Sequence, residues 1–200
     1  MMPDDAVSTA KGRATRDRIV GAAAELMHRR GVAGTGMPAV RAEAGVSSSQ
    51  IYHYFTDKDA LTRAVLDRWA EQIVASQVAM LGPVDDFDGL RGWRDEVVKG
   101  AAEGFGCPLG VLTTELAGED WARRVGGDGF LQWQSAIRDA LNRLVDGDVL
   151  GDGVDAEAWS LTLLSAIQGG LLLSRVTGST QPLTTALDTT LDALARAHEK

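Results

Sequence analysis

Residues Ala39–Lys58 read AVRAEAGVSSSQIYHYFTDK, and this stretch decides the fold. Gly45 separates two short helical patterns, and glycine allows the positive φ at which two helices can meet at a steep angle. Ser47 follows and suits a helix N-cap. Residues 48–54 carry hydroxyls, an amide and an imidazole, which fit base edges and phosphates better than they fit a hydrophobic core. The pattern predicts a helix-turn-helix that binds DNA sequence-specifically.

The patterns on either side of this stretch predict further helices. Apolar residues spaced by three or four positions indicate a helix over 13–30, which Gly31 ends. Short helices are expected over 37–44 and 47–54. Thr56–Asp59 matches a capping box, with aspartate in place of glutamate, and predicts a long helix from Asp57 to about Leu81. Such a helix is long enough to join a small head to a separate body.

The remaining residues also show helical spacing and no convincing strand alternation. The predicted helices cover 86–103, 108–117, 129–145, 155–176 and 183–198. The predicted fold class is all-α, with an N-terminal three-helix helix-turn-helix domain and a C-terminal helical domain for ligand binding and dimerisation. Residues 1–10 are expected to form a disordered tail, 11–56 the DNA-binding domain, and 57–200 the body.

The net charge of −8 is distributed unevenly. Residues 11–54 hold seven lysines and arginines against three acids, whereas residues 61–200 hold twelve against twenty-one. This asymmetry indicates a basic head on an acidic body. The head can meet phosphates while the body is repelled by them, which favours one orientation of docking.

The composition also narrows the chemistry. The single cysteine, Cys107, excludes an intramolecular disulfide and a cysteine-rich zinc site. No metal-ligand spacing, phosphate-binding loop or Ser/His/Asp set is evident, so we expect no metal, no cofactor and no enzymatic activity. Residues 159–173 form the most apolar segment and are too short and too polar to span a bilayer. A cytoplasmic location with no membrane partner is the simplest expectation.

A family resemblance becomes recognisable over residues 15–61, TRDRIVGAAAELMHRRGVAGTGMPAVRAEAGVSSSQIYHYFTDKDAL. This run resembles the N-terminal DNA-binding domain of TetR-family transcriptional repressors. The Gly-Val-Ser, Tyr-x-x-Phe and following lysine together are far more specific than a generic helix-turn-helix. The chain departs from the family pattern at Arg41, where alanine is usual, at Glu43, and at Gly36, where a serine or threonine cap is common. The phosphate contact that such a cap would make is therefore either missing or supplied by Thr35.

The resemblance implies a role for each polar residue of the reading helix. Four side chains would face the major groove: Ser48, Ser49, Gln50 and His53. Four others would hold phosphates: Ser47, Tyr52, Tyr54 and Lys58. The family also implies a homodimeric repressor bound to a pseudo-palindromic operator in double-stranded DNA. The segments FGCPLG (105–110) and IQGGLLL (167–173) are similar to the LmrA/YxaF-like branch.

The body is expected to bind a small hydrophobic or aromatic effector. Five tryptophans are many for this length, and two interpretations stay open: ordinary core packing, or the aromatic lining of a cavity. The predicted ligand-binding residues are Trp69, Phe105, Cys107, Trp133 and Trp159. For the cysteine, the alternatives are a small buried residue and a thiol that regulates DNA binding through redox chemistry.

The last two predicted helices are expected to form the dimer interface. The predicted interface residues form one apolar row with a small residue beside it: Trp159, Leu163, Ile167, Gly170 and Leu171. Gly169 and Gly170 suggest a close backbone approach, either to a helix of the partner or to a bulky neighbour within the same subunit.

Overall fold

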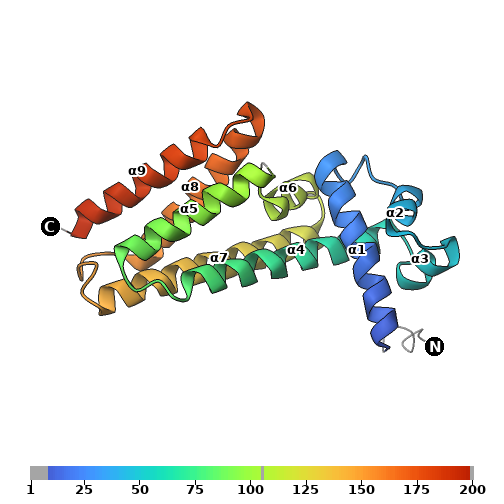
Figure 1. Ribbon diagram of the computed structural model, residues 1–200, viewed down its shortest axis with the longest axis horizontal. Coiled ribbons are helices and arrows are strands. Elements are labelled where there is room, and N and C mark those ends of the chain that lie inside the picture. Colours follow the sequence, from blue (N-terminus) through green and yellow to red (C-terminus); the bar gives the residue numbers. More distant parts are fainter. Residues whose placement is uncertain (1–8, 105, 199–200) are drawn as a thin grey trace. The chain divides into compact units, whose positions relative to one another are not determined.

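The computed structural model describes residues 9–104 and 106–198, and these residues form helices with no strand among them (Figure 1). The all-α prediction is therefore confirmed. The helices are α1 (Ala10–Arg30), α2 (Met37–Ala44), α3 (Ser48–Tyr54), α4 (Lys58–Leu81), α5 (Phe87–Glu103), α6 (Pro108–Glu115), α7 (Asp120–Asp146), α8 (Ala156–Thr177) and α9 (Gln181–His198). The expected tail falls on residues 1–8, outside the described residues, and on Thr9 and Ala10, which cap and begin α1.

The described chain divides into two compact units. The first contains residues 9–69 together with Leu112–Val125, and the second contains Ala70–Val111 together with residues 126–198. Residues 57–69, which the sequence placed in the body, lie with the helix-turn-helix. The helices α4 and α6 each begin in one unit and continue into the other.

The first unit packs α2 beside α1 (Figure 1). Its core contains the fully buried side chains of Ile19, Met27, Ile51 and Leu61. Arg18 of α1 donates from Nε to the carbonyl oxygen of Ala44 at 2.9 Å, at the last residue of α2. This bond satisfies one of the carbonyls that a helix end leaves without a partner, and it holds α2 against α1.

Local caps explain several helix starts. The Asp86 carboxylate accepts from the Gly89 N–H at 2.7 Å and caps α5, as expected for an acid at a helix start. The start of α4 differs from the prediction, because the capping side chain is Asp57 and not Thr56. The Asp57 carboxylate accepts from the Ala60 N–H at 2.7 Å, and the Thr56 hydroxyl donates to Asp57 instead. The long helix consequently starts one residue later, at Lys58.

In the second unit, α8 and α9 lie side by side in close contact (Figure 1). A Cβ added at Gly170 would lie 2.6 Å from the Cα of Leu183, so only glycine fits at this crossing. The close approach that Gly169 and Gly170 suggested is thus made at Gly170 and within the chain.

The start of α7 was predicted wrongly. The sequence placed this helix over 129–145, but it begins nine residues earlier at Asp120. A Cβ at Gly129 would lie 3.0 Å from Cδ2 of Leu109 and 3.3 Å from Cβ of Ala70. Close packing against these neighbours offsets the cost of glycine in a helix, which is about 1 kcal/mol per residue.

Candidate nucleic-acid interface and effector cavity

The turn before α3 has the geometry that its sequence predicts. Gly45 adopts a left-handed conformation with φ of 60°. Ser47 then caps α3 in a complete capping box: its hydroxyl accepts from the Gln50 N–H at 3.2 Å, and Gln50 Oε1 accepts from the Ser47 N–H at 2.9 Å. These two bonds set where α3 begins, so they also set which of its side chains face outward.

One face of α3 anchors the helix and the other is open. Ile51 and the following Phe55 are buried, and the Arg16 guanidinium lies 5.4 Å from the centre of the Phe55 ring. The exposed residues are those that the family resemblance assigned to DNA: Ser47, Ser48, Ser49, Gln50, Tyr52 and His53. Tyr54 and Lys58 are half-buried, and the rings of His53 and Tyr54 meet edge to face with centres 5.1 Å apart.

Hydrogen bonds within the exposed face of α3 already use some of the polar groups that could otherwise contact DNA. Gln50 uses its side-chain oxygen in the capping box, and its NH₂ group is the part of the amide that makes no bond there. The hydroxyls of Ser47 and Ser49 are 3.0 Å apart and bond to each other. His53 and Tyr52 extend from the helix as the large exposed side chains of this surface.

Arg41 is a candidate interface residue that the sequence patterns did not assign. It lies on α2, is exposed, and donates from Nη1 to the Ser48 hydroxyl at 2.6 Å. A permanent positive charge therefore stands beside the open face of α3. The departure from the family pattern at this position was the signal in the sequence.

Thr35 does not replace the missing cap of α2. Its side chain is buried, and its hydroxyl donates to the Gly31 carbonyl oxygen at 2.8 Å. Gly36 stands at the N-cap of α2 without a side-chain bond. The start of α2 therefore offers backbone N–H groups but no hydroxyl to a phosphate.

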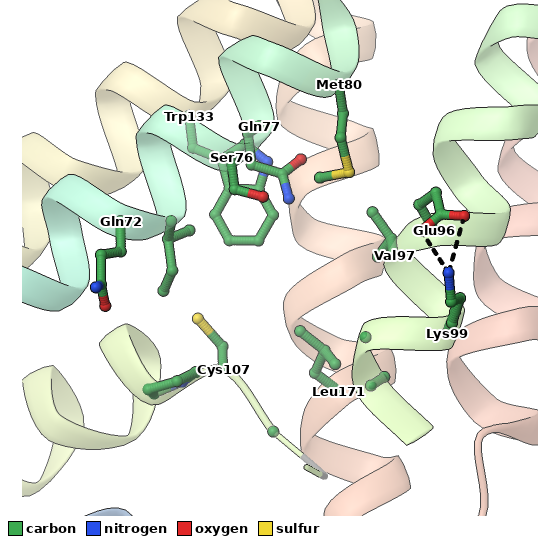
Figure 2. Close-up of a pocket in the computed structure, with 15 residues that line it drawn as sticks. Gln72, Ser76, Gln77, Met80, Glu96, Val97, Lys99, Cys107, Trp133 and Leu171 are labelled. Atoms are coloured by element: carbon green, nitrogen blue, oxygen red, sulfur yellow. Dashed lines mark hydrogen bonds and ion pairs between the residues drawn. The ribbon is translucent and has the colours of Figure 1, made fainter. Parts of the chain in front are cut away.

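The second unit contains a cavity of about 450 Å³. Its walls come from α4, α5, the segment before α6, α7 and α8 (Figure 2). The lining residues are Gln72, Ile73, Ser76, Gln77, Met80, Glu96, Val97, Lys99, Gly100, Ala101, Gly106, Cys107, Pro108, Trp133 and Leu171. The volume falls within the range of about 300–1,000 Å³ that is typical of small-molecule sites.

The structure places the predicted ligand residues in different surroundings. Cys107 and Trp133 line the cavity. Trp69 belongs to the first unit, where its ring centre lies 5.5 Å from that of His28, and Trp159 is half-buried and is not among the lining residues. Phe105 lies outside the described residues. The sequence missed the amides and hydroxyl of α4, because their convergence depends on packing against three other helices.

Burial determines the state of the Cys107 thiol. The residue is 7% exposed, and desolvation raises the pKa of its thiol, while a long hydrogen bond from the Gly110 N–H to Sγ, at 3.4 Å, lowers it by less. The net direction is upward. The side chain is therefore a neutral thiol at pH 7, which is a poor nucleophile.

The predicted dimer row lies mostly inside its own chain. Leu163, Ile167 and Gly170 are buried, and Leu171 lines the cavity. The opposite face of α8 is open and carries exposed apolar side chains: Leu161, Leu172, Leu173 and Val176. Within the described residues, α8 is also the one helix long and apolar enough to cross a bilayer by length and composition, although 39% of it is buried in the protein.

Metal binding has no candidate among the residues that the structure describes. No three histidine, cysteine, aspartate or glutamate side chains gather there at positions that could hold an ion. Three features of the described chain are candidates for recognising a partner: the open face around α3, the cavity of the second unit and the exposed apolar face of α8.

Comparison with known proteins gives two family matches and several relatives. Residues 19–65 match the family of bacterial regulatory proteins of the tetR type, and residues 83–189 match the C-terminal domain of LmrA/YxaF-like transcriptional regulators. An uncharacterised HTH-type regulator from the lacX 3′ region of Lactococcus lactis is 27% identical over 197 residues, covering 94% of this chain and 95% of the relative. One from Mycobacterium tuberculosis is 26% identical over 172 residues, covering 84% and 88%.

Solved structures share the fold. A TetR transcriptional regulator from Chloroflexus aurantiacus superposes with a TM-score of 0.79 at 25% identity, covering 92% of this chain and 96% of that one. A TetR-family regulator from Agrobacterium tumefaciens gives a TM-score of 0.80 at 17% identity, covering 91% and 98%. The C-terminal match alone spans more than half of the chain. The protein belongs to the TetR family of helix-turn-helix transcriptional regulators and carries a C-terminal domain of the LmrA/YxaF-like type.

Proposed function

We propose that this regulator is a homodimeric, cytoplasmic repressor that binds a pseudo-palindromic operator through α3 and releases it when an uncharged hydrophobic effector enters the cavity of the second unit. The observation that carries the proposal is the open polar face of α3, held by a complete capping box and joined by Arg41. Polar and cationic side chains of this kind are those that read base edges and hold phosphates.

Within the interface, the roles follow from which groups are free. Ser48, Ser49 and His53 would face base edges, and Gln50 could contribute through its remaining NH₂ group. Tyr52, Tyr54, Ser47 and Lys58 would meet phosphates. Arg41 would add a cation next to Ser48 and steady the orientation of that hydroxyl.

Dimerisation is supported by the exposed side of α8. Leu161, Leu172, Leu173 and Val176 present apolar surface that one chain leaves uncovered. An isologous contact between two copies of this face would cover it and pair two reading helices. Two half-sites one helical turn apart require those reading helices to be spaced by about 34–36 Å.

The chain itself offers a route from the cavity to the head. Cys107 and Pro108 line the cavity, α6 starts at Pro108, and its last residue, Glu115, accepts from the Ala33 N–H at 3.1 Å in the turn between α1 and α2. α4 likewise carries cavity residues at one end and follows the reading helix at the other. An effector that favours one position of these helices would shift the population of DNA-competent dimers.

Thiol-based regulation at Cys107 has less support. The side chain lines the cavity, which favours access by a small reagent, but its burial and raised pKa keep it a neutral thiol. The sequence contains no second cysteine to resolve an oxidised form. Reversible binding in the cavity is therefore the better account of regulation.

The DNA-binding role can be tested after selecting an operator from a random DNA library. His53→Ala is expected to lower affinity for the selected operator roughly 5- to 150-fold, because a base contact contributes about 1–3 kcal/mol, while affinity for random DNA changes little. Lys58→Ala should weaken both and reduce the slope of log K against log salt by about 0.9. Fluorescence anisotropy at several salt concentrations measures both quantities.

The control is Arg196→Ala, which removes an exposed charge from α9. It should leave both affinities and the salt slope unchanged. Equal losses on operator and random DNA for His53→Ala would contradict base reading by α3, and an unchanged salt slope for Lys58→Ala would contradict its phosphate contact.

A further inference from the structure

A buried amide in the cavity has its orientation determined by a neighbour. Gln77 of α4 is 7% exposed, and its Oε1 accepts a hydrogen bond from Trp93 Nε1 at 2.9 Å. Trp93, on α5, is itself buried. An indole N–H can only donate, so it requires the amide oxygen and not the amide nitrogen. The Gln77 NH₂ group is therefore held on the other side of the side chain.

That NH₂ group has no acceptor from the part of the protein that the structure describes. The bond from Trp93 is the hydrogen bond that Gln77 makes, and Gln77 lines the cavity. Figure 2 shows its amide between the Trp133 ring and the Met80 thioether. The Gln77 side chain is nine-tenths buried, so a bound molecule can reach this N–H only from the cavity. A ligand with a hydrogen-bond acceptor at this point would therefore pair with the Gln77 NH₂ group.

The rest of the lining sets the charge and polarity of that molecule. The two charged residues, Glu96 and Lys99, are exposed and pair with each other at 3.2 Å, so neither leaves a net charge in the cavity (Figure 2). Trp133 and Leu171 supply buried apolar walls. Placing an ionised ligand against such walls without a partner would be strongly unfavourable.

We propose that the effector is an uncharged molecule with an apolar body and an acceptor oxygen of the carbonyl type, and that Gln77 Nε2–H donates to this oxygen. Trp93 acts as a positioning residue, because its N–H keeps the amide from turning over. The inference rests on the proposed function only in treating the cavity as the effector site. Its consequence is a selectivity: acceptors bind better than matched molecules that lack one, and better than molecules that only donate.

Three flat tricyclic probes of nearly equal size test this selectivity by equilibrium dialysis without DNA. 9-Fluorenone carries a carbonyl, fluorene carries a methylene at the same position, and carbazole carries an N–H there. The full-length protein is expected to bind fluorenone about three- to tenfold more tightly than fluorene, as one hydrogen bond allows. Carbazole should bind no better than fluorene. Equal affinities for fluorenone and fluorene, or no binding of fluorenone, would overturn the proposal.

Variants assign the selectivity to Gln77. Gln77→Glu retains an acceptor for Trp93 and replaces the NH₂ group by an oxygen, so the ratio of fluorenone to fluorene affinity should fall to about one or below. Gln72→Glu is the matched control, because it introduces the same charge at an exposed lining position of the same helix. That variant should retain the preference for fluorenone.

A second variant is needed because Gln77→Glu could misfold, or its buried glutamate could be protonated and donate a hydrogen bond. Gln77→Met combined with Trp93→Phe removes the donor and its partner together, so no buried group is left unpaired. It should bind fluorenone and fluorene with equal affinity. A fluorenone preference that persists in both Gln77 variants would refute the assignment.

Trp93→Phe alone tests the positioning role. The freed amide can then turn its oxygen into the cavity, so carbazole should gain affinity relative to fluorenone, a change that a purely structural role would not produce. An unchanged order of the three probes would refute the positioning role. Anisotropy with operator DNA separates this inference from the proposed function. If the probes release operator DNA but the protein shows no preference for fluorenone, the inference about Gln77 is wrong and the proposed function stands. If the protein prefers fluorenone but no probe releases operator DNA, the proposed function is wrong and the inference about Gln77 stands.

Discussion

At the scale of single residues, hydrogen bonds within the protein fix the orientation of several side chains that are candidates for recognising DNA or an effector. Gln50 closes the cap of α3 with its oxygen, and Gln77 accepts from Trp93 with its oxygen, so in each glutamine the NH₂ group points away from this bond. Arg41 likewise bonds to Ser48 before any DNA is present. Recognition at both sites therefore depends on side chains whose orientation is settled in advance, which lowers the entropy lost on binding.

The thiol of Cys107 should react slowly while the protein is folded. Desolvation raises its pKa, so the neutral form persists at pH values where an exposed thiol, with an ordinary pKa near 9, has begun to ionise. Alkylation by iodoacetamide at pH 7 should be at least roughly tenfold slower in the native protein than in denaturant. Mass spectrometry of timed samples measures both rates.

The same shift gives a dependence of stability on pH. Because the folded pKa lies above the unfolded one, the contribution of this thiol to stability is fully present below the unfolded value and falls as the pH rises through it towards the folded value. Native and denatured protein that react at the same rate at pH 7 would contradict the assignment of Cys107 as a buried neutral thiol.

At the level of elements, the two faces of α8 differ: one packs inside the protein and the other exposes apolar side chains. Its buried side packs against α9 and contributes Leu171 to the cavity, whereas its exposed side carries Leu172 and Val176. Gly170 makes the packing on α9 possible, since any side chain there would collide with the backbone of Leu183.

Gly170→Ala is therefore expected to lower the free energy of unfolding by about 1–3 kcal/mol, as overpacking of a core does. The added Cβ would meet Leu183 Cα at 2.6 Å, and backbone cannot move aside cheaply. Gly92→Ala on α5 is the matched control, because no atom lies within 4 Å of its added Cβ; better helix propensity should leave it neutral or raise stability by up to about 1 kcal/mol. Urea denaturation measures both, and equal effects would contradict the close packing.

At the level of the whole molecule, charge and apolar surface are distributed by function. Residues 11–54 carry an excess of basic residues, and residues 61–200 carry an excess of acids. The cations stand where phosphates are expected, and the acidic body discourages other modes of contact with DNA. The exposed apolar face of α8 is the surface on which we propose that a second copy packs.

Leu172→Glu combined with Val176→Glu should convert the protein from dimer to monomer at micromolar concentration. These side chains are 63% and 76% exposed in one chain, and paired carboxylates facing each other across a two-fold axis would repel. Leu131→Glu on α7, at a side chain that is 64% exposed, is the control and should remain dimeric. Multi-angle light scattering decides the masses; a monomeric wild type, or a dimeric double variant, would exclude this interface.

Local sequence was sufficient wherever a structure depends on residues within about four positions. The turn at Gly45 and the caps at Ser47 and Asp86 were predictable, because each forms between a side chain or backbone and the next few N–H groups. The error at the start of α4, Thr56 in place of Asp57, reflects two neighbouring residues that can both accept a capping bond. The open face of α3 followed from the same local rules.

Features that depend on contacts between residues far apart in the sequence were decided only by tertiary packing. Gly129 stays helical because Leu109 and Ala70 fill the space that a side chain would need, and Gly170 faces α9 of its own chain. Leu171 was expected at the dimer interface and lines the cavity instead, beside Gln77, which no sequence pattern singled out. The sequence by itself thus determined the helices and the reading surface, whose contacts are local. The cavity and the orientation of its Gln77 amide depend on contacts between helices far apart in the chain, and only the tertiary structure brings them together.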